Sequence, residues 1–376
     1  MSALYIHVPF CKSRCTYCDF HSQTQLIHKD EYIKSIVREL EIRKDYLAGE
    51  TIETIYWGGG TPSLLQPNDF DLVFNAINQY YPISPNPEIT LEANPDDMDG
   101  TYIAGIKRLP FNRISMGIQS FHDPDLRFLN RRHTAQQAIN AVSRCRNAGY
   151  TNLSIDLMYG LPGQTQTLWE ANIDEALKLK IPHLSAYILM CEEGTVMYQQ
   201  LLSGAFEPLG DESVILLYDR LVEKLESAGY VHYEISNFCK TDCYSRHNTA
   251  YWTGRKYSGI GPAAHSYNWI ERQWNIASLP DYMEGISKRT PYVEKETIDR
   301  KTRYNEYLMT RLRTMWGIRL SDFQDTFGQE WLTRLLNRSG PYLRSGLMER
   351  NEETLKVSRK GIMVTDGIIR ELMVSD

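Results

Sequence analysis

Three of the seven cysteines lie within eight residues near the start of the chain, in the stretch VPFCKSRCTYCDF. Cys11, Cys15 and Cys18 follow a C-x3-C-x2-C spacing, which places three soft sulfur ligands on one short loop. Thiolates of this kind bind zinc, copper(I) or iron-sulfur clusters. An odd number of cysteines in a long chain argues against a disulfide framework. The spacing therefore predicts a metal site.

Zinc and an iron-sulfur cluster are the two main candidates for this site. Zinc prefers four ligands, and His7 or His21 could complete a Cys3His site. A 4Fe-4S cluster held by three cysteines leaves one iron without a protein ligand, open to a small molecule. We favour the cluster because the spacing lacks the paired knuckles common in zinc modules. Tyr17, just before the third cysteine, would then place an aromatic ring beside the bound molecule.

The cysteine loop follows the first of six β-rich segments that alternate with amphipathic helical patterns. The helical patterns include residues 29–47, 68–81 and 134–150. This alternation predicts right-handed crossovers and an α/β fold with a parallel sheet, the size of a partial (β/α)6 barrel. An open doubly wound sheet is the alternative. The six expected strands are residues 3–8, 51–57, 88–94, 112–119, 152–160 and 183–190.

The carboxyl end of each expected strand carries polar or glycine residues. Ligands of such barrels bind at this end of the strands, so these residues predict one binding mouth. Each of them alone could be an ordinary cap or turn. After the cysteine loop they are the GGGTP turn at 58–62, Glu92, Gln119 with Ser120, Asp156 and Tyr187.

The cysteine loop and the GGGTP turn, one strand apart, resemble the radical S-adenosylmethionine (SAM) superfamily. Further segments resemble its coproporphyrinogen III oxidase-like branch: YIHVPFC, LEANP, MGIQSF, LNRRH and IDLMYGLPGQT, which together span about residues 5 to 165. The resemblance implies a 4Fe-4S cluster on the three cysteines. Its open iron would chelate SAM, and electron transfer would cleave the sulfonium to give a 5'-deoxyadenosyl radical.

The same resemblance implies which residues line the SAM site. Glycines 58–60 would let the backbone approach the ligand closely. For Arg131 a surface salt bridge is the alternative role, because Arg132 is adjacent. The implied SAM residues are Tyr5, Tyr17, Gly59, Gly60, Thr61, Glu92, Gln119, Arg131 and Asp156.

Within the branch, the chain is most similar to the HemW family of haem chaperones. The oxidase carries a further cysteine two positions after the third, where this chain has Phe20, and a longer segment before the first cysteine. The stretch HNTAYW resembles an HNxxYW motif associated with haem binding in the chaperones. It implies haem contacts from His247, Asn248, Tyr251 and Trp252, with His247 as the iron ligand. Cys243 and His265 are the rival ligands.

We therefore expect a haem chaperone that transfers haem to acceptor haemoproteins, including those of a membrane respiratory chain. The alternatives are an oxygen-independent coproporphyrinogen III oxidase or another radical SAM enzyme of tetrapyrrole metabolism. Whether the protein is an enzyme is left open, with a carrier role favoured. A four-residue spacing of Cys239, Cys243 and His247 could suggest a second metal site, although a loop is the simpler interpretation.

Residues 1–285 are expected to form the barrel with a haem-binding extension, and residues 286–376 a small winged-helix-like α+β domain. The net charge of -6 excludes a dominant nucleic-acid surface, so no nucleic-acid partner is expected. The first ten residues lack the features of a secretory signal, and no apolar run is long enough to cross a bilayer. We expect a cytoplasmic protein, with a homodimer left open.

Overall fold

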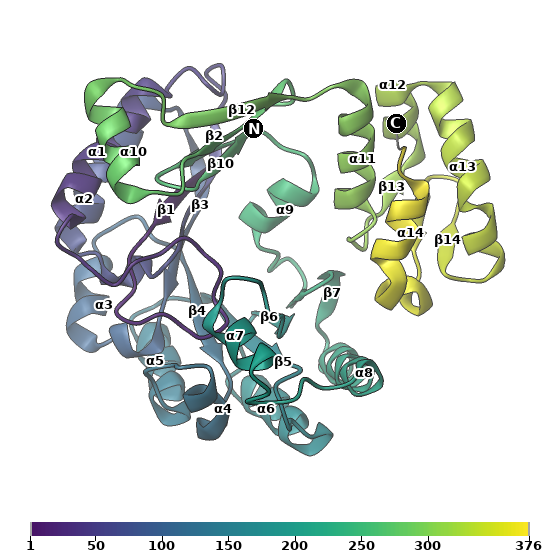
Figure 1. Ribbon diagram of the computed structural model, residues 1–376, viewed down its shortest axis with the longest axis horizontal. Helices are drawn as coiled ribbons and strands as arrows, with labels where there is room; N and C mark the ends of the chain where they lie inside the picture. The colour runs from purple at the N-terminus through teal and green to yellow at the C-terminus, as the bar shows by residue number, and fades with distance from the viewer. Residues whose placement is uncertain (1, 375–376) are drawn as a thin grey trace.

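The computed structural model describes residues 2–374 and contains a large parallel sheet with helices on its outer face (Figure 1). Six strands pair in chain order, each parallel to the next. Because the order never reverses, the sheet is singly wound, which confirms the partial (β/α)6 fold over the doubly wound alternative. These strands are β1 (Ser2–Val8), β2 (Ile52–Gly59), β3 (Ile83–Ala93), β4 (Arg113–Gln119), β5 (Asn152–Tyr159) and β6 (His183–Ile188).

The outer helices follow from apolar residues at helical spacing. In α1 (Lys29–Ile42), Tyr32, Ile33, Ile36 and Leu40 share one face and are buried against the sheet. A capping box at Thr134 starts α5. The other helices of this layer are α2 (Pro67–Tyr80), α3 (Gly100–Ile106), α4 (Asp123–Phe128), α5 (Ala135–Asn147), α6 (Gln166–Lys178) and α8 (Asp211–Ser227).

The sheet continues beyond the six expected strands at both edges, to 12 strands within residues 2–374. On one edge, β9 (Tyr257–Ile260) runs parallel to β1, followed by antiparallel β10 (His265–Tyr267), β11 (Glu271–Asn275) and β12 (Val293–Thr297). On the other edge, β8 (Asn237–Cys239) and β7 (Val231–Glu234) follow β6. Strands of three to five residues are too short for a readable alternation, which is why the sequence did not predict them.

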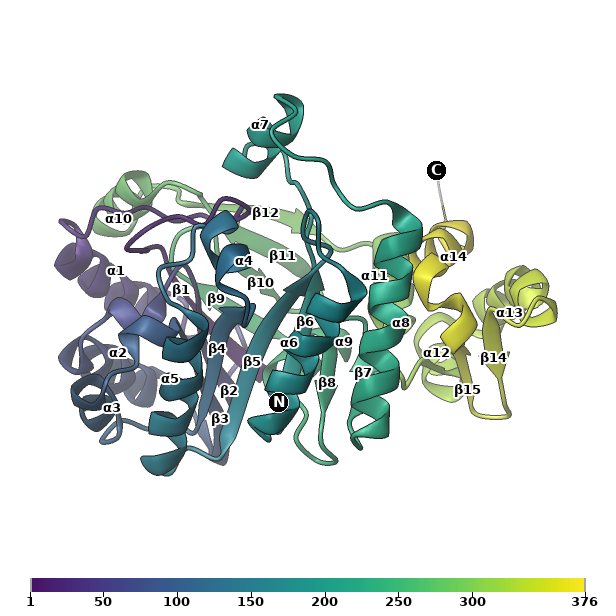
Figure 2. The same cartoon turned by 90° about the horizontal axis from the view of Figure 1, so that it is seen from below.

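Three further helices lie outside the main layer. The segment HNTAYW forms α9 (Arg246–Trp252), which packs against β1 and β2. The helix α10 (Leu279–Lys288) packs beside α1. The helix α7 (Val196–Leu202) projects beyond the carboxyl ends of the parallel strands (Figure 2) and receives the cysteine loop, because the Met197 amide donates to the Thr16 carbonyl at 2.8 Å.

The C-terminal region forms a small α+β domain beside the barrel (Figure 1), as expected. Tyr304, Phe323 and Leu335 belong to a separate apolar core. The boundary at residue 286 stays a prediction; because β12 belongs to the large sheet, we propose that it lies nearer residue 298. No helix within residues 2–374 is long and apolar enough to cross a membrane. The elements are α11 (Arg300–Arg311), β13 (Ile318–Arg319), α12 (Leu320–Phe327), α13 (Gln329–Arg344), β14 (Met348–Arg350), β15 (Thr354–Val357) and α14 (Thr365–Leu372).

Candidate cofactor site

The three-cysteine loop leaves the end of β1 and is anchored by backbone and side-chain hydrogen bonds. The Cys11 amide donates to the Gln23 carbonyl at 2.9 Å, which closes the loop on itself. Thr16 Oγ1 donates to the Phe128 carbonyl at 3.2 Å, and its amide to the Leu129 carbonyl at 3.3 Å. These contacts hold the cysteines over the carboxyl ends of the strands.

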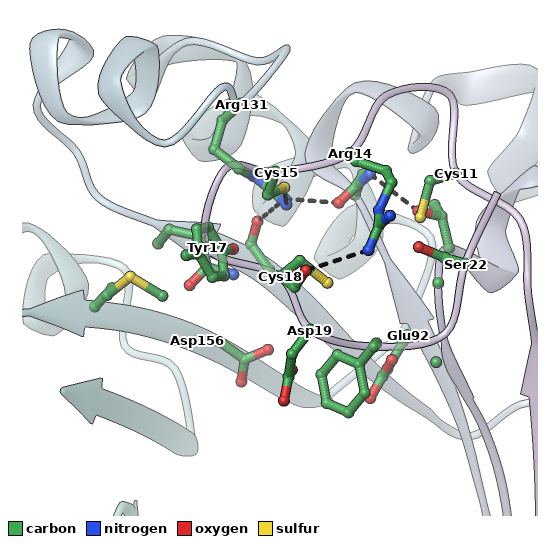
Figure 3. Close-up of a pocket in the computed structure, with 18 of the residues that line it drawn as sticks. Cys11, Arg14, Cys15, Tyr17, Cys18, Asp19, Ser22, Glu92, Arg131 and Asp156 are labelled. Carbon is green, nitrogen blue, oxygen red and sulfur yellow. Dashed lines mark hydrogen bonds between the residues drawn. The ribbon is translucent and has the colours of Figure 1, made fainter. Parts of the chain in front are cut away.

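Beneath the loop lies a cavity of about 390 Å³, which we call the cofactor cavity (Figure 3). Its size is in the range of small-molecule sites. It brings together all three cysteines and every implied SAM residue except Tyr5. Tyr5 lies outside the lining, stacked on Tyr56 at 6.2 Å between ring centroids. The residues lining the cavity include Cys11, Cys15, Cys18, Tyr17, Gly59, Gly60, Thr61, Glu92, Gln119, Arg131, Asp156 and Tyr187.

The adjacent residues Arg131 and Arg132 make different contacts. Arg131 reaches into the cavity, where Nη1 lies 3.2 Å from Cys15 Sγ and Nη2 donates to Asn94 Oδ1 at 2.6 Å. It is Arg132 that forms the ion pair near the surface, with Asp96 at 2.7 Å. The surface salt-bridge alternative therefore applies to Arg132, and Arg131 brings a cation beside a cysteine sulfur.

Two carboxylic acids face this cation across the cavity. Burial raises the pKa of Glu92 to about 7, despite the hydrogen bond that Tyr56 donates to its Oε1 at 2.6 Å. Burial also raises the pKa of Asp156 to about 6. Both acids are thereby poised to gain or lose a proton near neutral pH, and as carboxylates they can accept from hydroxyl or amino groups of a ligand.

Some polar atoms of the cavity lack partners within residues 2–374. Gln119 Oε1 and Arg131 Nε are buried without a hydrogen bond. Buried polar atoms are normally satisfied, so these two are suited to a polar ligand. The Thr61 hydroxyl donates to Cys11 Sγ at 3.5 Å, and burial raises the pKa of the Cys18 thiol to about 11. A bound metal would favour the thiolate form, so the donor set fits a metal cluster with an additional polar ligand.

The glycine turn also has a structural reason within the chain itself. A Cβ on Gly60 would lie 2.6 Å from the Phe10 carbonyl oxygen, and one on Gly59, where φ is +102°, would lie 2.7 Å from the His7 ring. These glycines therefore let the turn pack closely against the end of β1 and the start of the cysteine loop. They line the cavity as a consequence.

A zinc site would need a histidine that is free to bind. His7 Nε2 lies 2.9 Å from the His21 carbonyl and Nδ1 lies 3.2 Å from the Tyr5 hydroxyl, so both ring nitrogens are engaged. The His21 ring has no hydrogen-bond partner within residues 2–374, and no three Cys, His, Asp or Glu side chains of that range, the three cysteines included, are grouped as a site for one metal ion. The sequence did not single out Asn94 and Gly117, which hold Arg131, although both lie in the quoted LEANP and MGIQSF segments.

Comparisons with known proteins agree with this geometry. Residues 5–176 match the model of the Radical SAM superfamily, and residues 298–364 match the HemN C-terminal domain. The Heme chaperone HemW of Mycobacterium tuberculosis is 30% identical, covering 98% of this chain and 94% of the relative; that of Bacillus subtilis (strain 168) is 31% identical, covering 98% of each. The chain belongs to the HemW family of radical SAM proteins.

Other relatives of this HemW family member place it in the same branch. The zebrafish (Danio rerio) Radical S-adenosyl methionine domain-containing protein 1, mitochondrial, is 34% identical and covers 99% of this chain and 87% of the relative. The solved coproporphyrinogen III oxidase (HemN) from Escherichia coli superimposes with a TM-score of 0.87 at 21% identity, covering 99% of this chain and 90% of that one. The latter likeness shows a shared fold.

The HemW-type segment HNTAYW lies apart from the cofactor cavity. His247 is buried, its Nδ1 lies 2.8 Å from Thr54 Oγ1 and its Nε2 lies 3.0 Å from the Tyr251 hydroxyl. Burial lowers the pKa of His247 to about 3. His247 and Tyr251 thus lie on the same face of α9, and both ring nitrogens of the expected iron ligand are engaged within the protein. Asn248 and Trp252 are half-buried.

The two rival haem ligands lie in different surroundings. His265 is exposed on β10, with its ring stacked 6.0 Å from Trp274 between centroids. Cys243 lies in the turn before α9. Since Cys239 belongs to β8 and His247 to α9, the four-residue spacing does not follow one helical face.

Proposed function

We propose that this protein is a haem chaperone, which binds haem, passes it to acceptor haemoproteins, and carries a 4Fe-4S cluster with SAM. The observation that carries the proposal is the similarity to curated haem chaperones over 98% of the chain. The HNTAYW segment agrees with it. The fold shared with the oxidase supports the architecture alone, because one fold hosts several functions.

Cys11, Cys15 and Cys18 would hold the cluster in this proposal. When bound, cluster and SAM together supply one-electron chemistry. Arg131 would offer a cation to the SAM carboxylate, and Gln119 an acceptor to its amino group. Glu92 and Asp156 would accept from ribose hydroxyls, while Tyr17 would cover the ligand. Tyr5 stays a proposed SAM residue and would act through its contacts with the His7 and Tyr56 side chains.

For haem, the proposed residues are His247, Asn248, Tyr251 and Trp252. His247 could ligate iron only after its Nε2 is released from the Tyr251 hydroxyl. Acceptors of the haem would be haemoproteins, including those of a membrane respiratory chain, and the proposal is compatible with a monomer or a homodimer. A protein that must release its haem benefits from a single ligand rather than two.

Haem titration tests the function and the ligand separately. Absence of a Soret change in the wild type would overturn the chaperone proposal. In Tyr251→Phe the ring is kept but the competing hydroxyl is lost, so the Soret band should persist with equal or higher affinity. His247→Ala should alter the band; an unchanged spectrum and affinity would remove this ligand assignment, and His265→Ala and Cys243→Ser test the rivals.

The oxidase is the second candidate, favoured by the shared fold. We expect no protoporphyrinogen when the reconstituted protein is incubated with SAM, a reductant and coproporphyrinogen III. Clear product formation would overturn the carrier interpretation. SAM cleavage without that product is compatible with the carrier, because the cofactor cavity retains its polar groups.

A further inference from the structure

A second cavity, of about 380 Å³, lies between the sheet extension and the C-terminal domain. We call it the interdomain cavity. Its walls come from the end of α9, from β9 to β11, and from α11 and α12. Of these elements, α9 and α11 lie next to each other in Figure 1. The residues lining it are Tyr251, Thr253, Gly254, Arg255, Tyr257, Tyr267, Trp269, Arg272, Arg303, Glu306, Tyr307, Met309, Thr310, Arg311, Asp322 and Thr326.

Aromatic rings form much of this lining. Tyr251 and Tyr257 meet edge to face at 4.7 Å between centroids, and Tyr257 and Tyr267 lie 6.1 Å apart. Trp269, at the turn between β10 and β11, is 46% exposed. The tyrosines are half-buried, so the lining combines one exposed and several half-buried rings, a surface that suits a ligand with a flat apolar face. Tyr307 completes the set from the opposite wall.

The charge of the lining is positive. Four arginines stand beside Glu306 and Asp322 in the lining, and one of the four, Arg255, is paired with Glu53 at 2.8 Å. Arg272 is neutralised by Glu306 at 2.5 Å and by Glu296. Arg303, by contrast, has no hydrogen-bond or ion-pair partner for its side chain within residues 2–374. The guanidinium of Arg311 donates to the Thr253 carbonyl at 2.8 Å and lies over the Tyr307 ring, 5.1 Å from its centroid.

A flat, aromatic ligand with two carboxylates would match these features. We infer that the interdomain cavity is the porphyrin-binding site, with the macrocycle against the tyrosines and Trp269 and the two propionates at Arg303 and Arg311. This inference rests on the proposed haem-carrier function and adds to it a site outside the motif. The link to the motif is Tyr251, which lines the cavity and whose hydroxyl meets His247.

From the proposed site we expect porphyrin binding that does not depend on the iron. Aromatic contact and propionate pairing act on the macrocycle alone, so metal-free protoporphyrin IX should still bind to the full-length protein, lacking only the affinity that an iron bond to His247 adds for haem. Its dimethyl ester, in which both carboxylates are neutral, should bind at least about tenfold more weakly, because charge-assisted hydrogen bonds to guanidinium are lost. Equal affinity for acid and ester would overturn the site.

Arg303→Glu is the matching protein variant. Arg303 is exposed, so the fold should survive, and the reversed charge should weaken porphyrin binding about tenfold or more. Arg350→Glu is the control, since Arg350 is exposed on β14, on the side of the same domain away from α9 (Figure 1), and should change affinity less than about twofold. Thermal midpoints of both variants verify the fold.

The outcomes separate the inference from the function beneath it. If the wild type binds neither haem nor porphyrin, the haem-carrier function and this site both fail. If the wild type binds haem while Arg303→Glu binds it equally well, only the interdomain site fails. The site is supported if porphyrin affinity falls in Arg303→Glu but not in Arg350→Glu, and if the dimethyl ester binds weakly to the wild type.

Discussion

At the scale of single residues, the adjacent arginines 131 and 132 provide a matched test of the cofactor cavity. Arg131→Lys keeps the charge but loses the fork that reaches the Cys15 sulfur, Asn94 and Gly117 together. We expect SAM affinity of the reconstituted protein to fall about tenfold or more. Arg132→Lys, whose ion pair with Asp96 lies near the surface, should change it little. Equal effects of the two variants in a binding titration would contradict the assignment.

Glu92 predicts a dependence of stability on pH. Its pKa is raised from 4.5 to about 7, so between these values the native state binds more protons than the unfolded state. The contribution of Glu92 to the free energy of unfolding is therefore present in full below pH 4.5, and it is lost as the pH rises through 7. In Glu92→Gln, the cost of the buried charge disappears, and the variant should gain on the order of 2 kcal/mol over the wild type at pH 8.

Chemical denaturation without SAM, at pH 5.5 and pH 8, measures this difference. Titrations of acids that do not interact with Glu92 cancel in the comparison between wild type and variant, and Asp156→Asn in both backgrounds removes the one neighbouring acid that acts on it. The difference in unfolding free energy should be larger at pH 8 than at pH 5.5. The opposite trend would mean that Glu92 is stabilised as a carboxylate.

Residue types revealed the cofactor site better than the haem site. Cysteine spacing and polar strand ends act through local geometry, so the sequence identified most of the cavity lining. Burial is a tertiary property, and nothing in HNTAYW indicated that Thr54 and Tyr251 would engage both nitrogens of His247. The arginines at positions 303 and 311 have a helical spacing on α11 that is common on solvated surfaces, so only the structure relates them to Tyr251.

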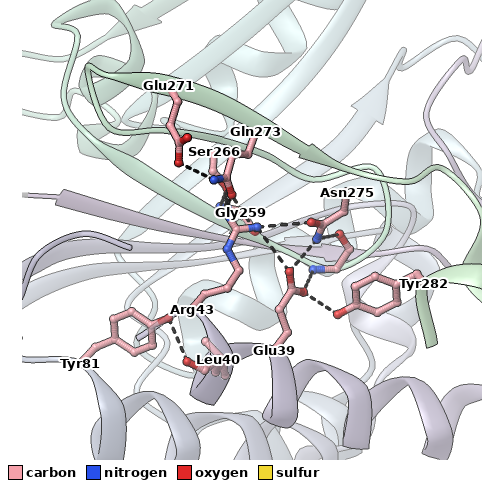
Figure 4. Close-up of polar contacts among 11 residues, drawn as sticks. Glu39, Leu40, Arg43, Tyr81, Gly259, Ser266, Glu271, Gln273, Asn275 and Tyr282 are labelled. Atoms are coloured by element: carbon pink, nitrogen blue, oxygen red, sulfur yellow. Dashed lines mark hydrogen bonds and ion pairs between the residues drawn. The ribbon is translucent and has the colours of Figure 1, made fainter. Parts of the chain in front are cut away.

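At the scale of elements, a buried polar network joins α1 to the sheet extension (Figure 4). Glu39 accepts from the Tyr282 hydroxyl at 2.5 Å, the Gly261 amide at 2.8 Å and Asn275 Nδ2 at 2.7 Å. Arg43 donates to Ser266 and Gln273 on the neighbouring strands. Burial raises the pKa of Glu39, although the cation of Arg43 opposes the shift. The short strands β9 to β11 thus depend on α1 for their position.

Removing one partner tests this dependence. Arg43→Ala leaves Glu39 buried without its cation, and we expect a loss of about 3 to 5 kcal/mol in unfolding free energy, measured in urea. Arg38→Ala removes a cation from the same helix that pairs with Glu41 near the surface, and should cost less than about 1 kcal/mol. Similar losses in both variants would mean that the network contributes no more than a surface pair.

The difference between local signals and long-range contacts explains which elements the sequence predicted. Strands β1 to β6 and helices α1, α2 and α5 carry their own periodicity, and α2 and α5 also begin with capping boxes. The extension is specified by long-range contacts instead, for example Arg43 with Gln273 across 230 residues. Such contacts have no local signature, so no pattern in residues 257–275 indicates a strand pairing with β1.

At the scale of the whole molecule, the two cavities are distinct and share no lining residue. They are nevertheless connected through packed side chains. Glu92 in the cofactor cavity bonds Tyr56, whose ring stacks on His247 at 4.8 Å, and His247 in turn meets Tyr251 of the interdomain cavity. The structure shows these contacts in one conformation. A continuous path of contacts does not by itself mean that binding in one cavity changes binding in the other.

The separation of the cavities leads to a last prediction about the cluster ligands. A variant with Cys11, Cys15 and Cys18 all changed to alanine should lose the cluster, because its three proposed ligands are gone. The fold should persist, since the cysteine loop lies outside the apolar core of the sheet except for its start at Phe10. Metal-free protoporphyrin IX, which needs no iron ligand, should then bind within about twofold of the wild-type affinity, measured by fluorescence titration.

A loss of more than about tenfold in this variant would contradict two independent sites. It would favour the rim of the cofactor cavity as the porphyrin site, where the apolar side chains of Phe20, Tyr187 and Met190 are 58%, 41% and 60% exposed. Phe20→Ser distinguishes the two positions, because it alters that rim and no residue of the interdomain cavity. Unchanged porphyrin affinity in Phe20→Ser, beside a tenfold loss in Arg303→Glu, is the result expected for a carrier that holds its cargo between the barrel and the C-terminal domain.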